Sequence, residues 1–291
     1  MTDTSDNRGF AARMFGLDRR WAFLFLAAVV VVTVVVRPTL PIPISREARR
    51  IYDFLNSLQE GEYIHLALDY DPPLQAELHP MTLSVLKQCF ERKIKVIITT
   101  LHHNGAVMAA TLIDTACQRH VQRTAYLPQS GVDWVYLGYK PLPEIVILGM
   151  GQNYRIPYPN DYDNVPVDSL PMMRGIRNLQ NVRAIINISG TDASDWWILY
   201  GNGRYRVPLA LGLTGVLAAD YYPYLQTGQV FGLLGGLQGA AEYETLVNAP
   251  GKAVAGMPVQ VAAHLVMIAF ILIGNIGYFV SQRKAGARAK R

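Results

Sequence analysis

Acidic, imidazole and hydroxyl side chains follow several apolar runs of this chain, at the points where strands of a sheet are expected to end. Asp69 and Asp71 follow the run YIHLAL, His102 and His103 follow IKVIITTL, and Ser189 closes AIINIS. Because the carboxyl ends of parallel strands meet at one edge of a sheet, we expect these side chains to lie near one another. That edge is the first place to look for chemistry.

Binding of a divalent cation is the first chemistry that these residue types suit. Carboxylates and imidazoles are common metal ligands, so Asp69, Asp71, His102 and His103 form a candidate metal site. The chain contains no HExxH sequence and no CxxC pair, so no defined metal motif supports this site. The competing interpretation is that the aspartates cap the starts of helices. We expect no cofactor other than such a metal.

Nucleophilic catalysis is the second chemistry. Ser189 could serve as the nucleophile, with His103 or His102 as its base and Asp69 or Asp192 as the acid that orients the base. The surrounding sequence, NISGT, differs from the GxSxG turn that exposes a nucleophilic serine in α/β hydrolases. The sequence therefore offers candidate catalytic residues without a catalytic motif.

Four glycines lie close together in the segment VFGLLGGLQGAAEYE, namely Gly232, Gly235, Gly236 and Gly239. Their spacing fits neither the dinucleotide loop GxGxxG nor the phosphate loop GxxxxGK[ST]. A strand, a tight turn at Gly235-Gly236 and a helix packed closely against another backbone would account for them. An anion site at the start of the helix and a seam between subunits are the alternatives.

The elements that must position these residues alternate between strand and helix. Several of the expected strands are apolar throughout, which is typical of parallel strands covered on both faces. Amphipathic segments such as GAVMAATLIDTACQRH separate them. The sequence therefore predicts an α/β fold with a Rossmann-like, doubly wound, mostly parallel sheet. The expected strands are residues 63–71, 94–101, 144–150, 182–189, 207–213 and 229–234.

A long polar segment interrupts this alternation. Residues 151–171, GQNYRIPYPNDYDNVPVDSLP, are too numerous for a simple turn, and the stretch SLPMMRGIRNL at their end predicts a helix. Long loops are often lids or contact surfaces, and tyrosines suit a contact surface. We therefore expect the tyrosines to face a sugar, a peptide partner or a neighbouring subunit, and the sequence does not rank these three.

The two cysteines, Cys89 and Cys117, each fall in a predicted amphipathic helix, on or near its apolar face. Free cysteine is among the most buried residue types, so two buried thiols are favoured. A disulfide is the alternative, since we expect this part of the chain outside the cytoplasm.

Two uncharged apolar runs explain why 51% of the residues are hydrophobic and only 17% are charged. The run Pro258–Val280 reaches about 34 Å as a helix, enough to cross a hydrocarbon core of about 30 Å. The run Trp21–Val36 reaches about 24 Å, and Trp21 and Arg37 extend its effective length. We expect two transmembrane helices, with a cleaved signal peptide as the alternative for the first.

Basic residues gather outside both runs. They are Arg8, Arg13, Arg19 and Arg20 before the first run, and Arg283, Lys284, Arg288, Lys290 and Arg291 after the second. By the positive-inside rule both termini are cytoplasmic and the segment between the runs is extracytoplasmic, which predicts a protein of the inner cell membrane. Residues 38–257 carry 17 Lys and Arg against 19 Asp and Glu, so we expect no nucleic acid as a partner.

These boundaries predict the organisation of the whole chain. It comprises a cytoplasmic basic tail (1–20), a transmembrane helix (21–37), a connector with an amphipathic helix (38–61), an extracytoplasmic α/β domain (62–250), a second transmembrane helix (257–281) and a second basic tail (282–291). Small and polar positions in the second span, Gly274, Asn275 and Gly277, favour contact with another helix.

The expected partners are therefore the lipid bilayer and either further copies of this chain, as a homo-oligomer, or other membrane subunits. The leading functional hypothesis is a non-enzymatic structural or assembly component, a scaffold, of a membrane complex. The alternative is a membrane-tethered hydrolase or metal-dependent enzyme with its site at the carboxyl ends of the strands.

Overall fold

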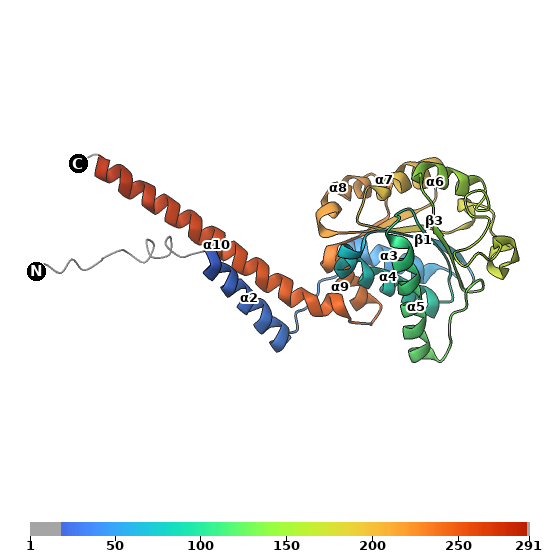
Figure 1. Ribbon diagram of the computed structural model, residues 1–291, viewed down its shortest axis with the longest axis horizontal. Coiled ribbons are helices and arrows are strands. Elements are labelled where there is room, and N and C mark those ends of the chain that lie inside the picture. Colours follow the sequence, from blue (N-terminus) through green and yellow to red (C-terminus); the bar gives the residue numbers. More distant parts are fainter. Residues whose placement is uncertain (1–18, 290–291) are drawn as a thin grey trace, which may run out of the picture. The chain divides into compact units, whose positions relative to one another are not determined.

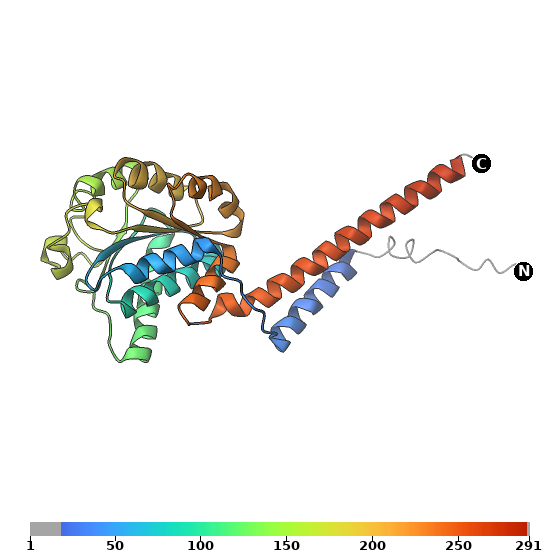
Figure 2. The same ribbon diagram turned by 180° about the vertical axis from the view of Figure 1, so that it is seen from behind.

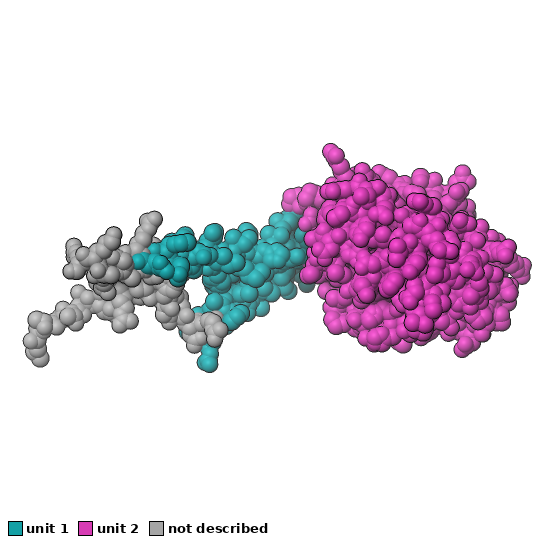
Figure 3. All heavy atoms as spheres, turned by 90° about the horizontal axis from the view of Figure 1, so that it is seen from above, with its two compact units in different colours: residues 1–40, 255–291 teal, residues 41–254 magenta. Residues whose placement is uncertain are grey.

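The chain divides into two compact units, which Figure 3 distinguishes by colour. In the computed structural model, residues 19–289 are described; the tail residues 1–18 and 290–291, with Arg8, Arg13, Lys290 and Arg291, lie outside them. One unit comprises residues 1–40 and 255–291, and the other comprises residues 41–254.

The first unit contains helix α2 (Arg19–Val36) and most of helix α10 (Lys252–Ala289). One stretch of α10, Lys252–Phe279, is long and apolar enough to cross a membrane by length and composition, whereas the apolar stretch of α2 is shorter. The rings of Phe25 and Phe270 meet edge to face, with their centroids 5.9 Å apart. The two helices therefore contact each other within this unit.

The second unit is built on one sheet of six strands, each parallel to its neighbours, in the order β3-β2-β1-β4-β5-β6. The chain moves outward from β1 to β3 and then returns to β4, so the order reverses between β1 and β4. This confirms the predicted Rossmann-like α/β fold. The strands are β1 (Tyr63–Asp69), β2 (Lys95–Thr100), β3 (Trp134–Tyr139), β4 (Ile185–Ser189), β5 (Leu209–Leu213) and β6 (Gly232–Gly235).

Helices cover both faces of this sheet, as Figures 1 and 2 show. One face carries α3 (Arg46–Ser57), α4 (Gln75–Glu91), α5 (Gly105–Thr124) and α9 (Gly236–Leu246). The other carries α6 (Pro143–Gln152), α7 (Ala193–Trp196), the π-helix η5 (Trp197–Arg204) and α8 (Gly215–Gln226). Short 3-10 turns are η1 (Pro72–Leu74), η2 (Val167–Ser169), η3 (Pro171–Met173) and η4 (Leu179–Asn181).

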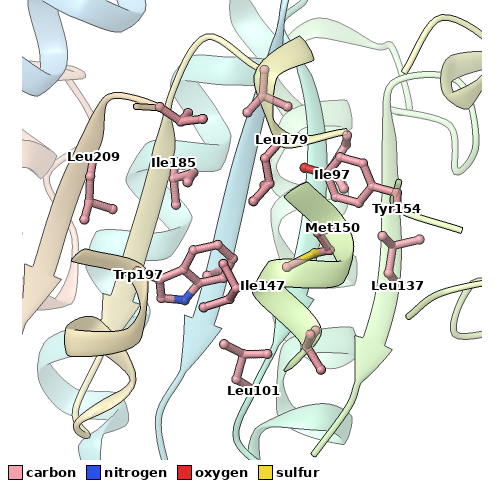
Figure 4. Packing of buried hydrophobic residues seen from close by; sticks show 14 of the residues in the cluster. Ile97, Leu101, Leu137, Ile147, Met150, Tyr154, Leu179, Ile185, Trp197 and Leu209 are labelled. Atoms are coloured by element: carbon pink, nitrogen blue, oxygen red, sulfur yellow. The ribbon is translucent and has the colours of Figure 1, made fainter. Parts of the chain in front are cut away.

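The core between the sheet and the second helix layer is shown in Figure 4. Trp197, Ile147 and Met150 are fully buried there, over strand residues such as Ile97 and Ile185. Burial of such large side chains contributes about 1.5–3 kcal/mol each, so this layer is a main source of the unit's stability.

The third strand is not the one predicted. Residues 144–150 form α6, and β3 comes from the earlier run WVYLGY. Pro143 and Glu144 in the first turn are helix-start signals, and a short apolar run alone does not separate a helix from a buried strand. Burial follows the helix, because Val146 and Ile147 are buried while Ile145 is 59% exposed.

The polar segment 151–171 packs more deeply than predicted. Tyr154 and Tyr158 are fully buried, and Tyr162 is partly exposed. The helix predicted from Ser169 to Leu179 is also wrong, because the chain there forms separate 3-10 turns. Pro171 and Gly175 interrupt this stretch, and both residue types disfavour a continuous helix.

The two cysteines, Cys89 on α4 and Cys117 on α5, are free and buried, as favoured from the sequence. Burial raises the pKa of both thiols, so both stay protonated and unreactive.

Candidate functional site

Asp69 ends β1 at the point where the strand order reverses, and it pairs in register with Ser189 of β4. Its carboxylate is fully buried and accepts three hydrogen bonds. Oδ1 accepts from the backbone N of Leu101 at 2.6 Å, and Oδ2 accepts from Asn187 Nδ2 at 2.7 Å and Trp197 Nε1 at 3.0 Å. These donors come from the segment after β2, from β4 and from η5.

Burial raises the pKa of Asp69 from 3.8 to about 6, and the three hydrogen bonds partly oppose that rise. The network extends one step further, because Ser194 donates to Asn187 Oδ1 at 2.7 Å. Asp69 therefore ties three strand ends together through an internal carboxylate.

Ser189 is also engaged internally. Its hydroxyl lies 3.1 Å from the carbonyl oxygens of Asp69 and Thr191, and it accepts a bond from the backbone N of Thr191 at 3.1 Å. The serine is fully buried. This geometry shapes the turn after β4 and does not present an exposed nucleophile.

A second buried polar group, His65, was not predicted from the sequence. It lies four residues before Asp69 on β1, so both side chains point to the same face of the sheet. Its ring nitrogens lie 3.0 Å from the hydroxyl of Tyr154 and 2.9 Å from that of Thr99. Burial lowers the pKa of His65 to about 3, so the ring is neutral. His65 and Asp69 are four residues apart in a predicted strand, so their spacing could have shown from the sequence that they share one face.

Asp71 and His102 form a more accessible pair at the same edge. His102 Nε2 lies 3.1 Å from Asp71 Oδ2, and Asn104 Nδ2 donates to Asp71 Oδ1 at 2.8 Å. The His102 side chain is 15% exposed and that of Asp71 is 33% exposed. Next to them, the ring of His103 lies 4.9 Å from that of His102. A carboxylate that orients an imidazole is an arrangement suited to proton transfer.

Asp192 lies at the N-cap position of α7, where its side chain makes no capping hydrogen bond, and it is exposed. The candidate metal ligands do not converge either. The carboxylate of Asp69 is bonded inside the core, whereas Asp71 and His102 bond to each other near the surface. Among residues 19–289, no group of three or more His, Cys, Asp or Glu side chains is placed to hold a metal ion.

The crevice at the strand-order reversal also lacks the features of a phosphate site. The connection from β1 to α4 contains Pro72 and Pro73, which have no N–H group to offer an anion. On the facing strand end, a Cβ on Gly190 would lie 2.0 Å from the side chain of Leu74. Leu74 therefore occupies the space beside β4.

The glycine segment is a set of close approaches within the chain. A Cβ on Gly232 would lie 2.9 Å from the carbonyl oxygen of Glu47 on α3. Gly236 has a positive φ of 59°, and a Cβ there would lie 2.9 Å from the Cα of Gly215. Backbones meet closely at these positions, and the segment contains no phosphate loop. Gly235 approaches Ala218, and Gly239 approaches Leu234.

The two glutamates after these glycines, Glu242 and Glu244, are buried and accept hydrogen bonds from backbone N–H groups at the starts of helices. Glu242 accepts a hydrogen bond from the backbone N of Ser45, the N-cap residue of α3, at 3.1 Å. Glu244 accepts bonds from the backbone N of Gly251 and of Val254, each at 2.9 Å. The carboxylate of Glu244 thus satisfies N–H groups at the start of α10.

The small and polar residues of α10 lie within its apolar stretch. Among the described residues, Gly274 has no neighbour that a Cβ would meet within 4 Å. The side chain of Asn275 donates to the carbonyl oxygen of Ile271, one turn earlier in its own helix, at 2.8 Å. Gly277 follows one turn after Gly274. Their role as a helix-contact seam stays a prediction.

The fold and the site define a class, a six-stranded, all-parallel α/β unit joined to an apolar helix. No protein-family model and no curated protein matches the chain. Among solved structures, the trehalose-6-phosphate synthase OtsA is similar to it at a TM-score of 0.29 and 10% identity, over 83% of this chain and 47% of that one. The chain thus spans about half the length of that protein, and so low a score carries no argument about function.

Proposed function

We propose that this protein is a membrane-anchored, non-enzymatic structural or assembly component of a membrane complex. The observation that carries the proposal is that two of the candidate catalytic groups at the strand ends are engaged inside the chain. Asp69 and Ser189 are fully buried and hydrogen-bonded within the chain. Buried polar groups with complete internal partners specify a fold, whereas catalytic groups need access to a substrate.

We further propose that both α2 and α10 cross the inner cell membrane, with both termini in the cytoplasm and residues 62–250 outside it. The apolar stretch Lys252–Phe279 supports the second span. The basic residues beyond each run support the orientation.

Cysteine labelling in intact cells tests this topology. Because Cys89 and Cys117 are buried, single cysteines can be added without removing them. A maleimide that does not cross membranes should label Ser169→Cys, an exposed position of the α/β unit, and spare Ser5→Cys and Ala285→Cys. Labelling of both tail positions would overturn the orientation, and labelling of only one would overturn the two-span topology.

Self-association is part of the proposal. Val107, Ile145 and Val216 lie in the first turns of α5, α6 and α8 and are 69%, 59% and 86% exposed. These helices follow β2, β3 and β5, so the three side chains lie toward the same edge of the sheet. Exposed apolar side chains toward one edge of the sheet support a contact with another subunit.

The mass of the purified protein in mild detergent, measured by light scattering, tests self-association. We expect a homo-oligomer that Val216→Asp dissociates, while Asp163→Ala on an exposed loop leaves it intact. A monomer at all concentrations would contradict the homo-oligomeric form of the proposal.

An enzyme is the second candidate, and the Asp71–His102 pair is the observation that favours it. In this alternative the pair and His103 would act on a substrate outside the membrane, as a hydrolase or with a divalent metal. Asp71→Ala and His103→Ala should leave assembly intact if the protein is structural. A metal bound at one per chain and lost in both variants would instead favour the enzyme.

A further inference from the structure

Charge is divided unevenly between the two edges of the sheet. Beyond the buried Asp69, the segments from each strand end through the first turn of the next helix carry one basic residue, Lys140, against five acidic ones that are exposed or partly exposed. These are Asp71, Glu77, Glu144, Asp192 and Asp195. At the other edge, the amino edge where the strands begin, residues 87–95, 119–133 and 204–206 carry eight basic residues against two acidic ones. The amino edge is therefore the basic side of the unit.

Most of these cations are not matched by a carboxylate. Lys93 pairs with Glu60 at 2.8 Å, and Lys87 pairs with Glu91 at 2.7 Å. The other acidic residue of the three segments, Asp133, accepts hydrogen bonds from a tyrosine and a backbone N–H. The remaining six cations form no ion pair with another residue that the structure describes. They are Arg92, Lys95, Arg119, Arg123, Arg204 and Arg206.

Both segments that lead out of this unit start at the amino edge. Ser45, from which the chain runs back to α2, is bonded by Glu242 of α9 and caps α3. A Cβ on Gly232, the first residue of β6, would lie 2.9 Å from a carbonyl oxygen in the first turn of α3. Glu244, also on α9, accepts a bond from the N–H of Gly251, just before α10. The basic edge is thus the edge at which the chain continues to α2 and α10.

A groove of about 70 Å³ lies at this edge, where the C-terminal parts of α4 and α5 meet the residues just before α10. Arg119 and Arg123 line it from α5, Lys87 from α4, and residues 249–251 from the loop. Both arginines are exposed, and neither forms a hydrogen bond or ion pair with another described residue. The carboxylate in the groove, Glu244, is engaged by backbone N–H groups at the start of α10.

The spacing of the two arginines favours an anion between them. Arg119 and Arg123 are four residues apart, so they lie on the same face of α5. Like charges at this spacing destabilise a helix, and a bound anion would remove that repulsion. A guanidinium group has a planar fork of N–H donors that fits the oxygens of a phosphate group. The groove therefore suits a phosphate better than a carboxylate-free loop alone would require.

We propose that this groove binds the phosphate of an anionic phospholipid headgroup at the membrane surface. Arg119 and Arg123 donate hydrogen bonds to the phosphate oxygens, while the acyl chains stay in the bilayer. The lipid is the source of the phosphate because the groove is built partly from residues 249–251, directly before the helix that leads into the membrane. Basic residues close to a membrane segment are attracted to anionic lipids. This inference rests on the proposed crossing of the membrane by α10.

Such binding would also orient the α/β unit. The basic amino edge would be held toward the anionic surface, and the acidic carboxyl edge would be repelled by it. The exposed apolar side chains of Val107, Ile145 and Val216, which lie toward the carboxyl edge, would then remain available for another subunit.

Native mass spectrometry of the full-length protein in mild detergent tests the lipid preference. It compares bound phosphatidylglycerol, which is anionic, with bound phosphatidylcholine, which has a phosphate but no net charge. We expect the unchanged protein to prefer phosphatidylglycerol. Arg119→Gln/Arg123→Gln should weaken its binding by at least about tenfold, because each basic residue near a membrane surface contributes about fivefold.

Arg174→Gln/Arg177→Gln is the matched control, since it removes two exposed arginines that lie outside the groove. It should bind phosphatidylglycerol normally. The basic tails are identical in all three proteins, so a difference between them reports the groove. Equal binding by all three proteins, or an equal loss in both double variants, would overturn the proposal. Displacement of the lipid by an equal concentration of inorganic phosphate would overturn the lipid as the source of the phosphate.

An alkaline wash of membranes tests the crossing by α10 separately, because it releases proteins that do not span the bilayer. Release of the unchanged protein would contradict the proposed topology and, with it, the lipid as the source of the phosphate. Retention of the unchanged protein and of Arg119→Gln/Arg123→Gln, with no difference in lipid preference between them, would contradict the groove alone.

Discussion

The two edges of the sheet differ in how their buried polar atoms are satisfied. At the carboxyl edge, the carboxylate of Asp69 accepts three hydrogen bonds and the hydroxyl of Ser189 bonds within its own turn. At the amino edge, Nδ1 of His120 is buried without a partner among the described residues, beside a cavity of about 530 Å³. The position of a residue at a strand end is therefore a weaker guide to its role than the state of its hydrogen bonds.

At the carboxyl edge, Asp69→Ala is expected to give the largest loss of stability. The substitution removes the acceptor for the Leu101 N–H, Asn187 Nδ2 and Trp197 Nε1, and each buried donor left unpaired costs about 1–3 kcal/mol. We expect the free energy of unfolding to fall by about 3–5 kcal/mol. Thermal unfolding followed by tryptophan fluorescence measures it.

Asp163→Ala is the control for that change, because Asp163 is an exposed aspartate on a loop. Its melting temperature should stay near that of the unchanged protein. If Asp69→Ala melted at the same temperature as Asp163→Ala, the hydrogen bonds to Asp69 would not stabilise the carboxyl edge.

The pH dependence of stability separates the two buried titrating groups of β1, Asp69 and His65. The pKa of Asp69 is raised to about 6, so its contribution is complete below about pH 4 and is lost as pH rises toward 6. The pKa of His65 is lowered to about 3, so its contribution is complete above about pH 6.5 and is lost as pH falls toward 3. The two contributions oppose each other between about pH 4 and pH 6.

Removing one of these two groups should reveal how the other makes the free energy of unfolding depend on pH. Relative to the unchanged protein, Asp69→Asn should lose stability as pH falls from about 6 to 4, and His65→Gln should gain it, each by about 2 kcal/mol. Unfolding by urea at a series of pH values gives both curves. Because other histidines also titrate, the difference from the unchanged protein is the quantity to compare, and slopes of the same sign would contradict the assignment.

Replacing a polar residue with an apolar one at the amino edge should raise the free energy of unfolding, the opposite of the effect of Asp69→Ala. His120→Leu removes a buried ring nitrogen that has no partner, so we expect the free energy of unfolding to rise by about 1 kcal/mol. A clear loss of stability would mean that Nδ1 makes a favourable interaction in the native fold, so that its burial is not a net cost.

The sequence indicated the carboxyl edge well and the amino edge not at all. Continuous apolar runs placed Asp69 and Ser189 at neighbouring strand ends, where they pair in register. The partners of Asp69 come from residues about 30 to 130 positions away, such as Trp197, and local patterns carry no record of such distances. His120 looked like an ordinary residue of an amphipathic helix, because an empty space beside a side chain has no sequence signal.

Asp71→Asn should have the smallest effect on stability, and it tests whether the hydrogen-bond network of Asp69 extends to Asp71. Asp71 is only two residues from Asp69, but its side chain is one-third exposed. Asparagine keeps an oxygen that accepts from Asn104, and water replaces the bond to His102, so we expect a change below about 0.5 kcal/mol in thermal unfolding. A loss as large as that of Asp69→Ala would extend the network to the surface and would join the Asp71–His102 pair to the fold instead of leaving it available for chemistry.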